Sequence, residues 1–258
     1  MLTRRLMLAG AATLCAGSAR AAGEAVTKTV TVVSRPGNVS PEQFLARLAA
    51  EYGPLAATLP GQKGLIVSGV AMAQPRTDVV QFGIDPYDAV IESFFGSAED
   101  QDRAAASPAG TALNTALAKL VGAARHFVTR ETVVVPLPTD HRPKIVGLTF
   151  VMKPPSVSDA DFRKEWIVVH GPMAQKVPHL RGFIVSERVS DAPVPGVPPL
   201  RMDGPLQGFT ESWVDDVQGR AAMMATPEAK AWYAHGAEIF GKIRTDLLIE
   251  NVLQPVSV

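Results

Sequence analysis

Hydrophobic and polar positions along the chain predict two rounds of the same order of elements, β-α-β-β-α-β. Short apolar runs rich in β-branched residues predict strands, and a Ser or Thr cap before an apolar-periodic segment predicts a helix start. In the first round we expect strands at residues 29–34, 64–71, 89–95 and 127–135, with helices from Ser40 and Ser107. In the second round we expect strands at residues 145–152, 182–189, 206–214 and 249–253, with helices from Ser158 and Thr226. Gly53-Pro54 and Gly171-Pro172 are expected to end the first helix of each round.

The two rounds are an internal duplication. Residues of the first half match the second half at a constant offset of 118, which becomes 119 after one inserted residue. Matched positions include Pro36 with Pro154, Gly53-Pro54 with Gly171-Pro172, Gly64 with Gly182, Glu92-Ser93 with Glu211-Ser212, and Pro108 with Pro227. We therefore divide the chain into residues 1–21, a first repeat at 22–138 and a second repeat at 139–258.

Each repeat has the order of a ferredoxin-like unit, whose four-stranded antiparallel sheet carries both helices on one face. The other face of each sheet still needs cover. We predict an α+β fold in which the two sheets pack face to face as an intramolecular dimeric α/β barrel. Two independent units side by side are the alternative, and the short proline-rich linker at 136–143 favours the barrel.

Residues 1–21 have the pattern of an export signal. Arg4-Arg5 precedes a short apolar run, and Ala19 and Ala21 suit signal peptidase. The paired arginines favour the twin-arginine route over an ordinary secretory signal. The run is too short to span a bilayer. We therefore expect a periplasmic or secreted protein that has lost Cys15, its only cysteine, and is not inserted in the membrane.

Composition and missing motifs exclude several functions. Of the 258 residues, 47% are hydrophobic and only 19% are charged, with 25 basic against 25 acidic side chains. The sequence has no cluster of basic residues of the kind that binds nucleic acid. The sequence has no phosphate-binding glycine loop, nucleophile elbow or Cys-x-x-Cys pair, and its histidines are too scattered for an evident metal site. No cofactor is evident from the sequence.

The second repeat carries a string of residues that resembles a known family. The string comprises Phe162, Trp166, His170-Gly171-Pro172, Gly182-Phe183, Glu211-Ser212-Trp213, Thr226-Pro227 and Trp232. It resembles the EthD-like branch of the dimeric α/β-barrel proteins over residues 144–256, and more weakly over 28–137. The resemblance implies the fold firmly. It implies a reaction only loosely, because relatives include monooxygenases, isomerases, dehydratases and haem proteins.

His170 is the leading candidate for an acid or base. It follows Phe162 and Trp166 at steps of four, which places the three side chains along one helix face. Burial would lower the pKa of this imidazole and a helix C-terminus would raise it, so titration near neutral pH is expected. The first repeat has Tyr52 at the matching place, which suggests one scaffold copy and one functional copy. The alternative is that His170 only caps its helix.

The remaining candidates are predicted to surround His170. Glu211 shares a strand face with Phe209 and Trp213 and could orient the imidazole, although Glu92 at the matching place suggests a structural salt bridge equally well. The predicted substrate-binding side chains are Trp166, Phe183, Trp213, Trp232 and His235. His126, His141 and His179 are assigned no role.

These observations favour an exported enzyme acting on a small, largely apolar, oxygen-bearing molecule. His170 would move a proton in an oxidation, dehydration or isomerisation that needs no evident cofactor. Two alternatives remain open: a periplasmic binding protein without catalysis, and a haem protein with His170 as axial ligand. The sequence also leaves a homodimer open.

Overall fold

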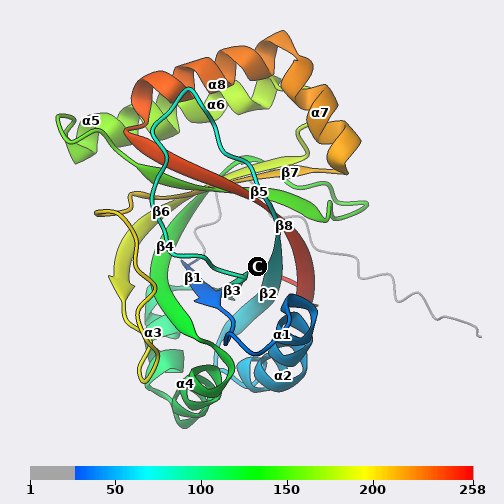
Figure 1. Cartoon of the computed structure of the whole chain (residues 1–258), viewed down its shortest axis with the longest axis vertical. Coiled ribbons are helices and arrows are strands. Elements are labelled where there is room, and N and C mark those ends of the chain that lie inside the picture. Colours follow the sequence, from blue (N-terminus) through cyan, green and yellow to red (C-terminus); the bar gives the residue numbers. More distant parts are fainter. Residues whose placement is uncertain (1–26, 258) are drawn as a thin grey trace, which may run out of the picture.

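The computed structural model describes residues 27–257 and contains both predicted rounds (Figure 1). The first repeat comprises β1 (Thr27–Ser34), α1 (Pro41–Arg47), η1 (Leu48–Tyr52), α2 (Gly53–Ala56), β2 (Gln62–Ala73), β3 (Ala89–Phe95), α3 (Ala98–Ala106), α4 (Pro108–Leu120) and β4 (Ala123–Val135). The second comprises β5 (Ile145–Met152), α5 (Asp159–Arg163), η2 (Lys164–His170), α6 (Gly171–Met173), η3 (Ala174–Lys176), β6 (Gly182–Ala192), β7 (Gly208–Val214), α7 (Val217–Ala225), α8 (Pro227–Ile239) and β8 (Lys242–Gln254). The predicted signal at 1–21 lies outside the described residues.

Within residues 27–257 the strands close into one antiparallel barrel, in the order β1-β3-β2-β8-β5-β7-β6-β4. Each repeat supplies four adjacent strands, and the two sheets are joined where β2 pairs with β8 and β4 pairs with β6. The predicted intramolecular barrel is confirmed, and two independent units are excluded because both seams are continuous hydrogen-bonded ladders.

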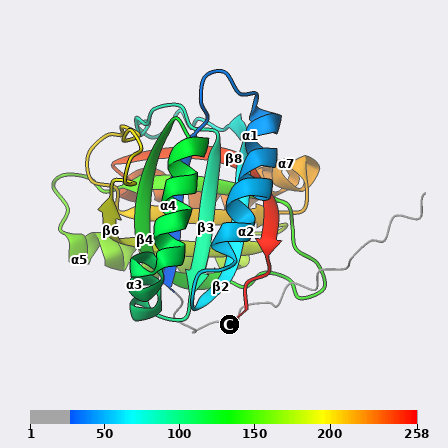
Figure 2. The ribbon, with the colours of Figure 1, turned by 90° about the horizontal axis from the view of Figure 1, so that it is seen from below.

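Helices cover the outer face of each half of the barrel (Figures 1 and 2). One apolar core lies inside the barrel, around Phe127, Phe150 and Phe209. Two further cores lie between the sheets and their helices, one in each repeat. Side chains on the inner face of a strand therefore enter the core of the barrel, whereas side chains on its outer face enter the layer between sheet and helices. No helix within residues 27–257 is long and apolar enough to cross a bilayer.

The predicted helix starts follow from their caps. Ser40 and Gln43 form a complete capping box at α1, and the hydroxyls of Ser107 and Thr226 accept from backbone N–H groups at the starts of α4 and α8. The structure adds α3 and α7, which the sequence prediction missed. It also extends the last strand of each repeat toward its start, to β4 and β8.

Gly53-Pro54 and Gly171-Pro172 do not end their helices, contrary to the prediction. A π-helical turn precedes each pair, in which Gly53 donates to the carbonyl of Leu48 and Gly171 to that of Trp166. A proline has no N–H and collides with the carbonyl four residues back. The wider π-turn removes this conflict, so the helix continues through α2 and α6. Tyr52 and His170 consequently lie inside continuous helices and not at helix ends.

Candidate functional site

The two repeats hold matched pockets between their sheet and their helices. The pocket of the first repeat, called here the first cavity, has a volume of about 290 Å³. The pocket of the second repeat, called the second pocket, has a volume of about 40 Å³, which is room for a few water molecules. The sequence prediction assigned the functional site to the second repeat, whereas the space for a ligand lies in the first.

Polar groups line the floor of the first cavity. The hydroxyls of Thr29, Thr31 and Ser93 come from the outer faces of β1 and β3. His126 on β4 lies beside them, with its Nδ1 2.8 Å from Thr31 Oγ1. Burial lowers the pKa of His126 below its ordinary value, so the imidazole is neutral at neutral pH.

The remaining walls of the first cavity are largely apolar. They include the side chains of Leu59, Phe95, Leu113, Leu117, Val128 and Val194. Tyr52 also lines the cavity, and burial raises the pKa of its phenol, which therefore stays protonated and can donate. The cavity is suited to a compact apolar molecule that presents an oxygen to the floor.

His170 lines the second pocket, and neighbouring side chains enclose its imidazole. Its ring stacks against Trp232 and His235, with centroid separations of 5.6 and 5.4 Å, and its Nδ1 lies 3.1 Å from His235 Nδ1. Burial, with the nearby His235 and Arg76, lowers the pKa of His170 to about 3. The expected titration near neutrality is wrong, because the helix does not end at His170 and supplies no opposing dipole there.

Two other predicted residues join His170, and one lies farther off. Phe183 and Trp232 line the second pocket and meet edge to face at 5.0 Å. Trp166 instead packs against Phe162 and Phe240 in the core beside the pocket. His235, predicted to bind substrate, contacts His170 directly and does not line the pocket.

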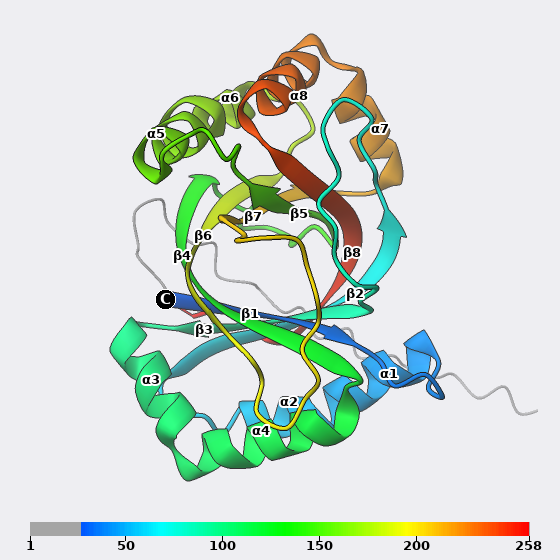
Figure 3. The same ribbon diagram turned by 60° about the vertical axis from the view of Figure 1, so that its left-hand side comes forward.

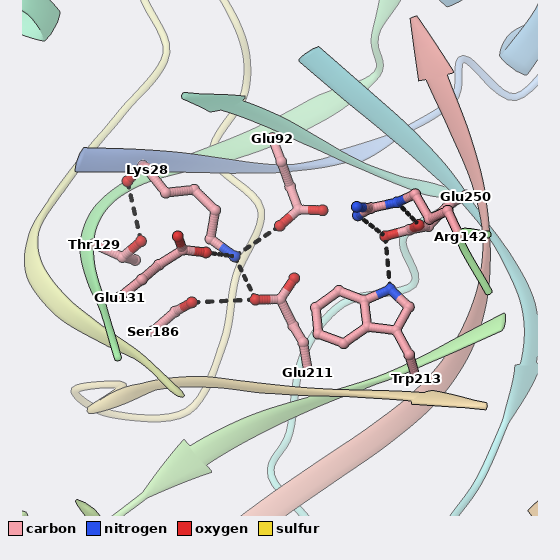
Figure 4. A network of polar contacts seen from close by, with 9 residues as sticks. All are labelled: Lys28, Glu92, Thr129, Glu131, Arg142, Ser186, Glu211, Trp213 and Glu250. Atoms are coloured by element: carbon pink, nitrogen blue, oxygen red, sulfur yellow. Dashed lines mark hydrogen bonds and ion pairs between the residues drawn. The ribbon is translucent and has the colours of Figure 1, made fainter. Parts of the chain in front are cut away.

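Glu211 and Trp213 do not reach His170. Both point into the barrel, on the face of β7 opposite to the helices (Figure 4). Glu211 bonds to Lys28 Nζ, and Ser186 Oγ donates to it at 3.2 Å. The proposed orientation of His170 by Glu211 is therefore wrong, since the sheet separates the two side chains.

The cluster inside the barrel ties the repeats together. Lys28 Nζ bonds to Glu92 at 2.8 Å, to Glu131 at 3.0 Å and to Glu211, so one cation from the first repeat holds carboxylates of both. The sequence alternative of a structural salt bridge fits this arrangement. Burial beside Glu92 raises the pKa of Glu211 to about 8, whereas Lys28 holds the pKa of Glu92 low. At neutral pH the pair therefore shares one proton.

A second ion pair completes the cluster. Arg142, from the linker, donates through Nε and Nη2 to Glu250 at 2.7 and 3.0 Å. Trp213 Nε1 donates to the same carboxylate at 3.0 Å. Trp213 thus has a structural partner inside the barrel and no contact with the predicted site.

Matched residues explain why the pockets differ in volume. Leu113 on α4 corresponds to Trp232 on α8 in the 119 register, and Ala104 corresponds to Met223. The indole of Trp232 and the side chain of Met223 are buried in the core that occupies the second repeat. The smaller residues leave the same region of the first repeat hollow.

The sequence interpretation missed His126. In the 119 register His126 matches Thr245, whose hydroxyl lies 2.8 Å from that of Thr149 on the neighbouring strand. Thr31 matches Thr149, so the same cross-strand polar pair occurs in both repeats, with an imidazole only in the first. Comparing the repeats at strand positions, as was done for the helices, would have found it.

Neither a metal nor haem fits the predicted site. No group of three or more His, Cys, Asp or Glu side chains among residues 27–257 is arranged to hold a metal ion. The second pocket, at about 40 Å³, has no space for a haem beside His170. The proposal of His170 as an axial ligand therefore has no geometric support.

Comparison with known proteins agrees with the fold. No curated protein sequence matches the chain. An anthrone oxidase-like protein superposes with a TM-score of 0.56 at 13% identity, covering 89% of this chain and 94% of its own. Proposed monooxygenases of Fusobacterium nucleatum subsp. nucleatum and Lactobacillus acidophilus give TM-scores of 0.57 and 0.52, at 7% and 11% identity. Each superposition covers 91% of this chain, together with 96% of the Fusobacterium protein and 98% of the Lactobacillus protein. At these identities the likeness concerns the fold alone.

The family model of the EthD domain matches the chain twice, at residues 36–122 and 154–242. The two matches fall in the two halves of the barrel and together cover more than half of the sequence. This protein is therefore a member of the EthD family in which one domain is duplicated in tandem.

Proposed function

We propose that this protein binds and transforms a compact, largely apolar molecule that carries an oxygen, and that it does so in the first cavity. One observation carries the proposal: a cavity of about 290 Å³ places a histidine and three hydroxyls on one side of apolar walls. A largely apolar pocket with a few convergent polar groups is the usual form of a small-molecule site. The names of the neighbouring structures, an anthrone oxidase-like protein and two proposed monooxygenases, are compatible with such substrates.

His126 is the acid–base group in this proposal. In the tautomer with hydrogen on Nδ1, the imidazole donates to Thr31 Oγ1, and Nε2 is left to accept a proton from the substrate. Removal of a proton next to an oxygen-bearing carbon would begin an isomerisation, a dehydration or an oxidation by dioxygen. Because the pKa of His126 is lowered, the base is available at neutral pH.

The role expected of His170 is assigned to His126 for two reasons. The second pocket lacks the volume for an apolar substrate. The imidazole of His170 is also in contact with the rings of Trp232, His235 and Phe240, which leaves a substrate little access to it. The two histidines therefore give a direct test of which repeat is functional.

The first experiment is native mass spectrometry of the purified protein, to identify any small molecule that remains bound. Binding of 2-naphthol, a compact apolar phenol with fluorescence that responds to proton transfer, gives a second readout. We expect His126→Gln to abolish turnover of the identified substrate and to change the emission of bound 2-naphthol. His170→Gln should alter neither. The opposite result would return the function to the second repeat.

A binding protein without catalysis is distinguished by the same variants. If His126→Gln retains the co-purified ligand and no product forms with the wild type, the cavity stores the molecule and does not convert it. We also propose export through the twin-arginine route, supported by the sequence of residues 1–21. Replacement of Arg4 and Arg5 by Lys should leave the protein in the cytoplasm upon cell fractionation.

A further inference from the structure

Each repeat sends a chain segment, called here a strap, to the helices of the other repeat (Figure 3). The first strap, residues 74–88, joins β2 to β3 and reaches the second pocket, and the second strap, residues 193–207, joins β6 to β7 and reaches the first cavity. Matched parallel bridges anchor the two straps, Gln81 to Ile243 and Pro199 to Ala124. The straps therefore follow the same 118 and 119 register as the rest of the fold.

Matched residues of the two straps line the two pockets. In the 118 register Arg76, which lines the second pocket, matches Val194, which lines the first cavity between Pro193 and Pro195 of the same strap. The first cavity thus receives an isopropyl group and the second pocket a guanidinium. Such an exchange changes the chemistry of the ligand that each pocket can accept.

Part of the Arg76 guanidinium is free to bind a ligand. Its Nε donates to Asp78 Oδ1 at 2.9 Å, and its Nη2 donates to Asp78 Oδ2 and to the carbonyl of Tyr233, the latter at 2.8 Å. Nη1 has no hydrogen-bond partner among residues 27–257. It lies 3.5 Å from where a Cβ on Gly236 would be. The side chain is only 14% exposed.

The opposite side of the second pocket presents hydroxyls. Thr149 and Thr245 share one hydrogen between their oxygens at 2.8 Å, which leaves the other hydrogen able to donate to a ligand. Thr210 lines the same pocket, and its hydroxyl has no hydrogen-bond partner within residues 27–257. No Asp or Glu is among the described residues that line this pocket, whereas Asp102 is at the rim of the first cavity, which has no Lys or Arg.

We propose that the second pocket is a separate binding site for a small oxyanion, a carboxylate of formate or acetate size, held between Arg76 of the first repeat and the threonine hydroxyls of the second. A volume of about 40 Å³ admits only a few non-hydrogen atoms. A guanidinium opposite hydroxyl donors is the arrangement that carboxylates bind. This proposal does not depend on the function proposed for the first cavity.

Thermal unfolding in sodium acetate, compared with sodium chloride at equal ionic strength, tests the site. For so small a ligand we expect a Kd of roughly 0.1–10 mM. The unfolding midpoint should then rise by roughly 3–10 °C at 100 mM acetate and remain nearly constant in chloride. Broadening of the ¹³C-acetate NMR signal gives the affinity independently.

Arg76→Met should weaken acetate binding at least 10-fold. The matched control is Arg201→Met, because Arg201 lies on the other strap, is 85% exposed and pairs with Asp85 of the first repeat. Should Arg76→Met fail to fold, Thr210→Val removes one hydroxyl at constant volume and should weaken binding several-fold. Equal shifts in acetate and chloride, or an acetate affinity in Arg76→Met and Thr210→Val that equals that of the wild type, would overturn the proposal. Binding of 2-naphthol to the same variants reports separately on the first cavity.

Discussion

The two pockets of this barrel occupy the same place in two copies of one domain, and they differ in what fills them. In the second repeat Trp232, Phe183 and His170 pack against one another and leave about 40 Å³. In the first repeat Leu113 and Ala104 stand at matched positions of the helices and leave about 290 Å³. The aromatic string that identifies the family in the second repeat is therefore mainly a packed core. The copy with the weaker family pattern has the space for a ligand.

The difference also shows how a duplication inside one chain can divide labour. In a symmetric dimer both pockets would be identical, because one sequence forms both halves. Here each pocket has one histidine, on the strand floor in the first repeat and on the helix in the second. Each also has a different strap residue, Val194 or Arg76. Two pockets with different ligand chemistry can then share one rigid barrel.

The largest expected effect comes from filling the first cavity as the second is filled. Leu113→Trp places an indole where Trp232 lies in the other repeat, within a region that has space for it. We expect binding of 2-naphthol to weaken by roughly 100-fold or more, because the ligand and the indole compete for one volume. The unfolding midpoint should stay equal or rise. A folded variant with unchanged affinity would show that the ligand binds elsewhere.

The reciprocal change should convert the second pocket into a hollow one. Trp232→Leu removes a large side chain that is 5% exposed, and we expect the free energy of unfolding to fall by about 2–4 kcal/mol. The stoichiometry of 2-naphthol should rise from one to two per chain, measured by titration calorimetry. If the stoichiometry stays at one while stability falls, the repeat has collapsed around the smaller side chain.

The duplicated register made the fold predictable, because the same caps, prolines and glycines recur at the same spacing. The period of two along β7 also correctly placed Phe209, Glu211 and Trp213 on one face. The period of two could not show which face of β7 the helices cover. All three side chains lie on the other face, inside the barrel, and therefore away from His170. The pocket volumes were equally beyond prediction, since a cavity depends on how distant side chains such as Leu113 and Tyr52 meet.

The charged cluster inside the barrel predicts that the stability of the protein falls as the pH rises. The pKa of Glu211 is raised in the folded protein, to about 8 from an ordinary 4.5, so the folded state holds the proton more tightly than the unfolded state. Stability from this group is complete below pH 4.5 and is lost as pH rises toward 8 and above. Glu211→Gln keeps the neutral form and should be more stable than the wild type at pH 9 by roughly 1–3 kcal/mol.

Denaturant unfolding at pH 5, 7 and 9 measures this effect. Glu51→Gln is the control, because Glu51 is an exposed partner of Arg47 on η1 and should leave the pH profile unchanged. A Glu211→Gln profile parallel to that of the wild type would mean that Glu211 is ionised throughout and that Lys28 compensates it fully.

The smallest expected effect separates the positioning of His126 from its presence. Thr31→Val removes the oxygen 2.8 Å from His126 Nδ1 but keeps the imidazole and the cavity volume. Loss of one neutral hydrogen bond should reduce turnover about 3–10-fold. We expect no change of similar size in the affinity for 2-naphthol or in the free energy of unfolding. Thr115→Val, on the exposed side of α4, is the control.

The pH profile of the same variant distinguishes a base from a bystander. Because the pKa of His126 is lowered by burial, activity of the wild type should persist below pH 6.5 and fall only when the imidazole becomes protonated. Without Thr31, the hydrogen on Nδ1 loses its acceptor in both protonation states of His126. The charged imidazolium loses the stronger hydrogen bond, so the pKa of His126 and the acid limb of the activity profile should move further down in pH. An acid limb that does not move in Thr31→Val, together with reduced turnover, would assign the titrating base to another group and leave His126 as a ligand contact.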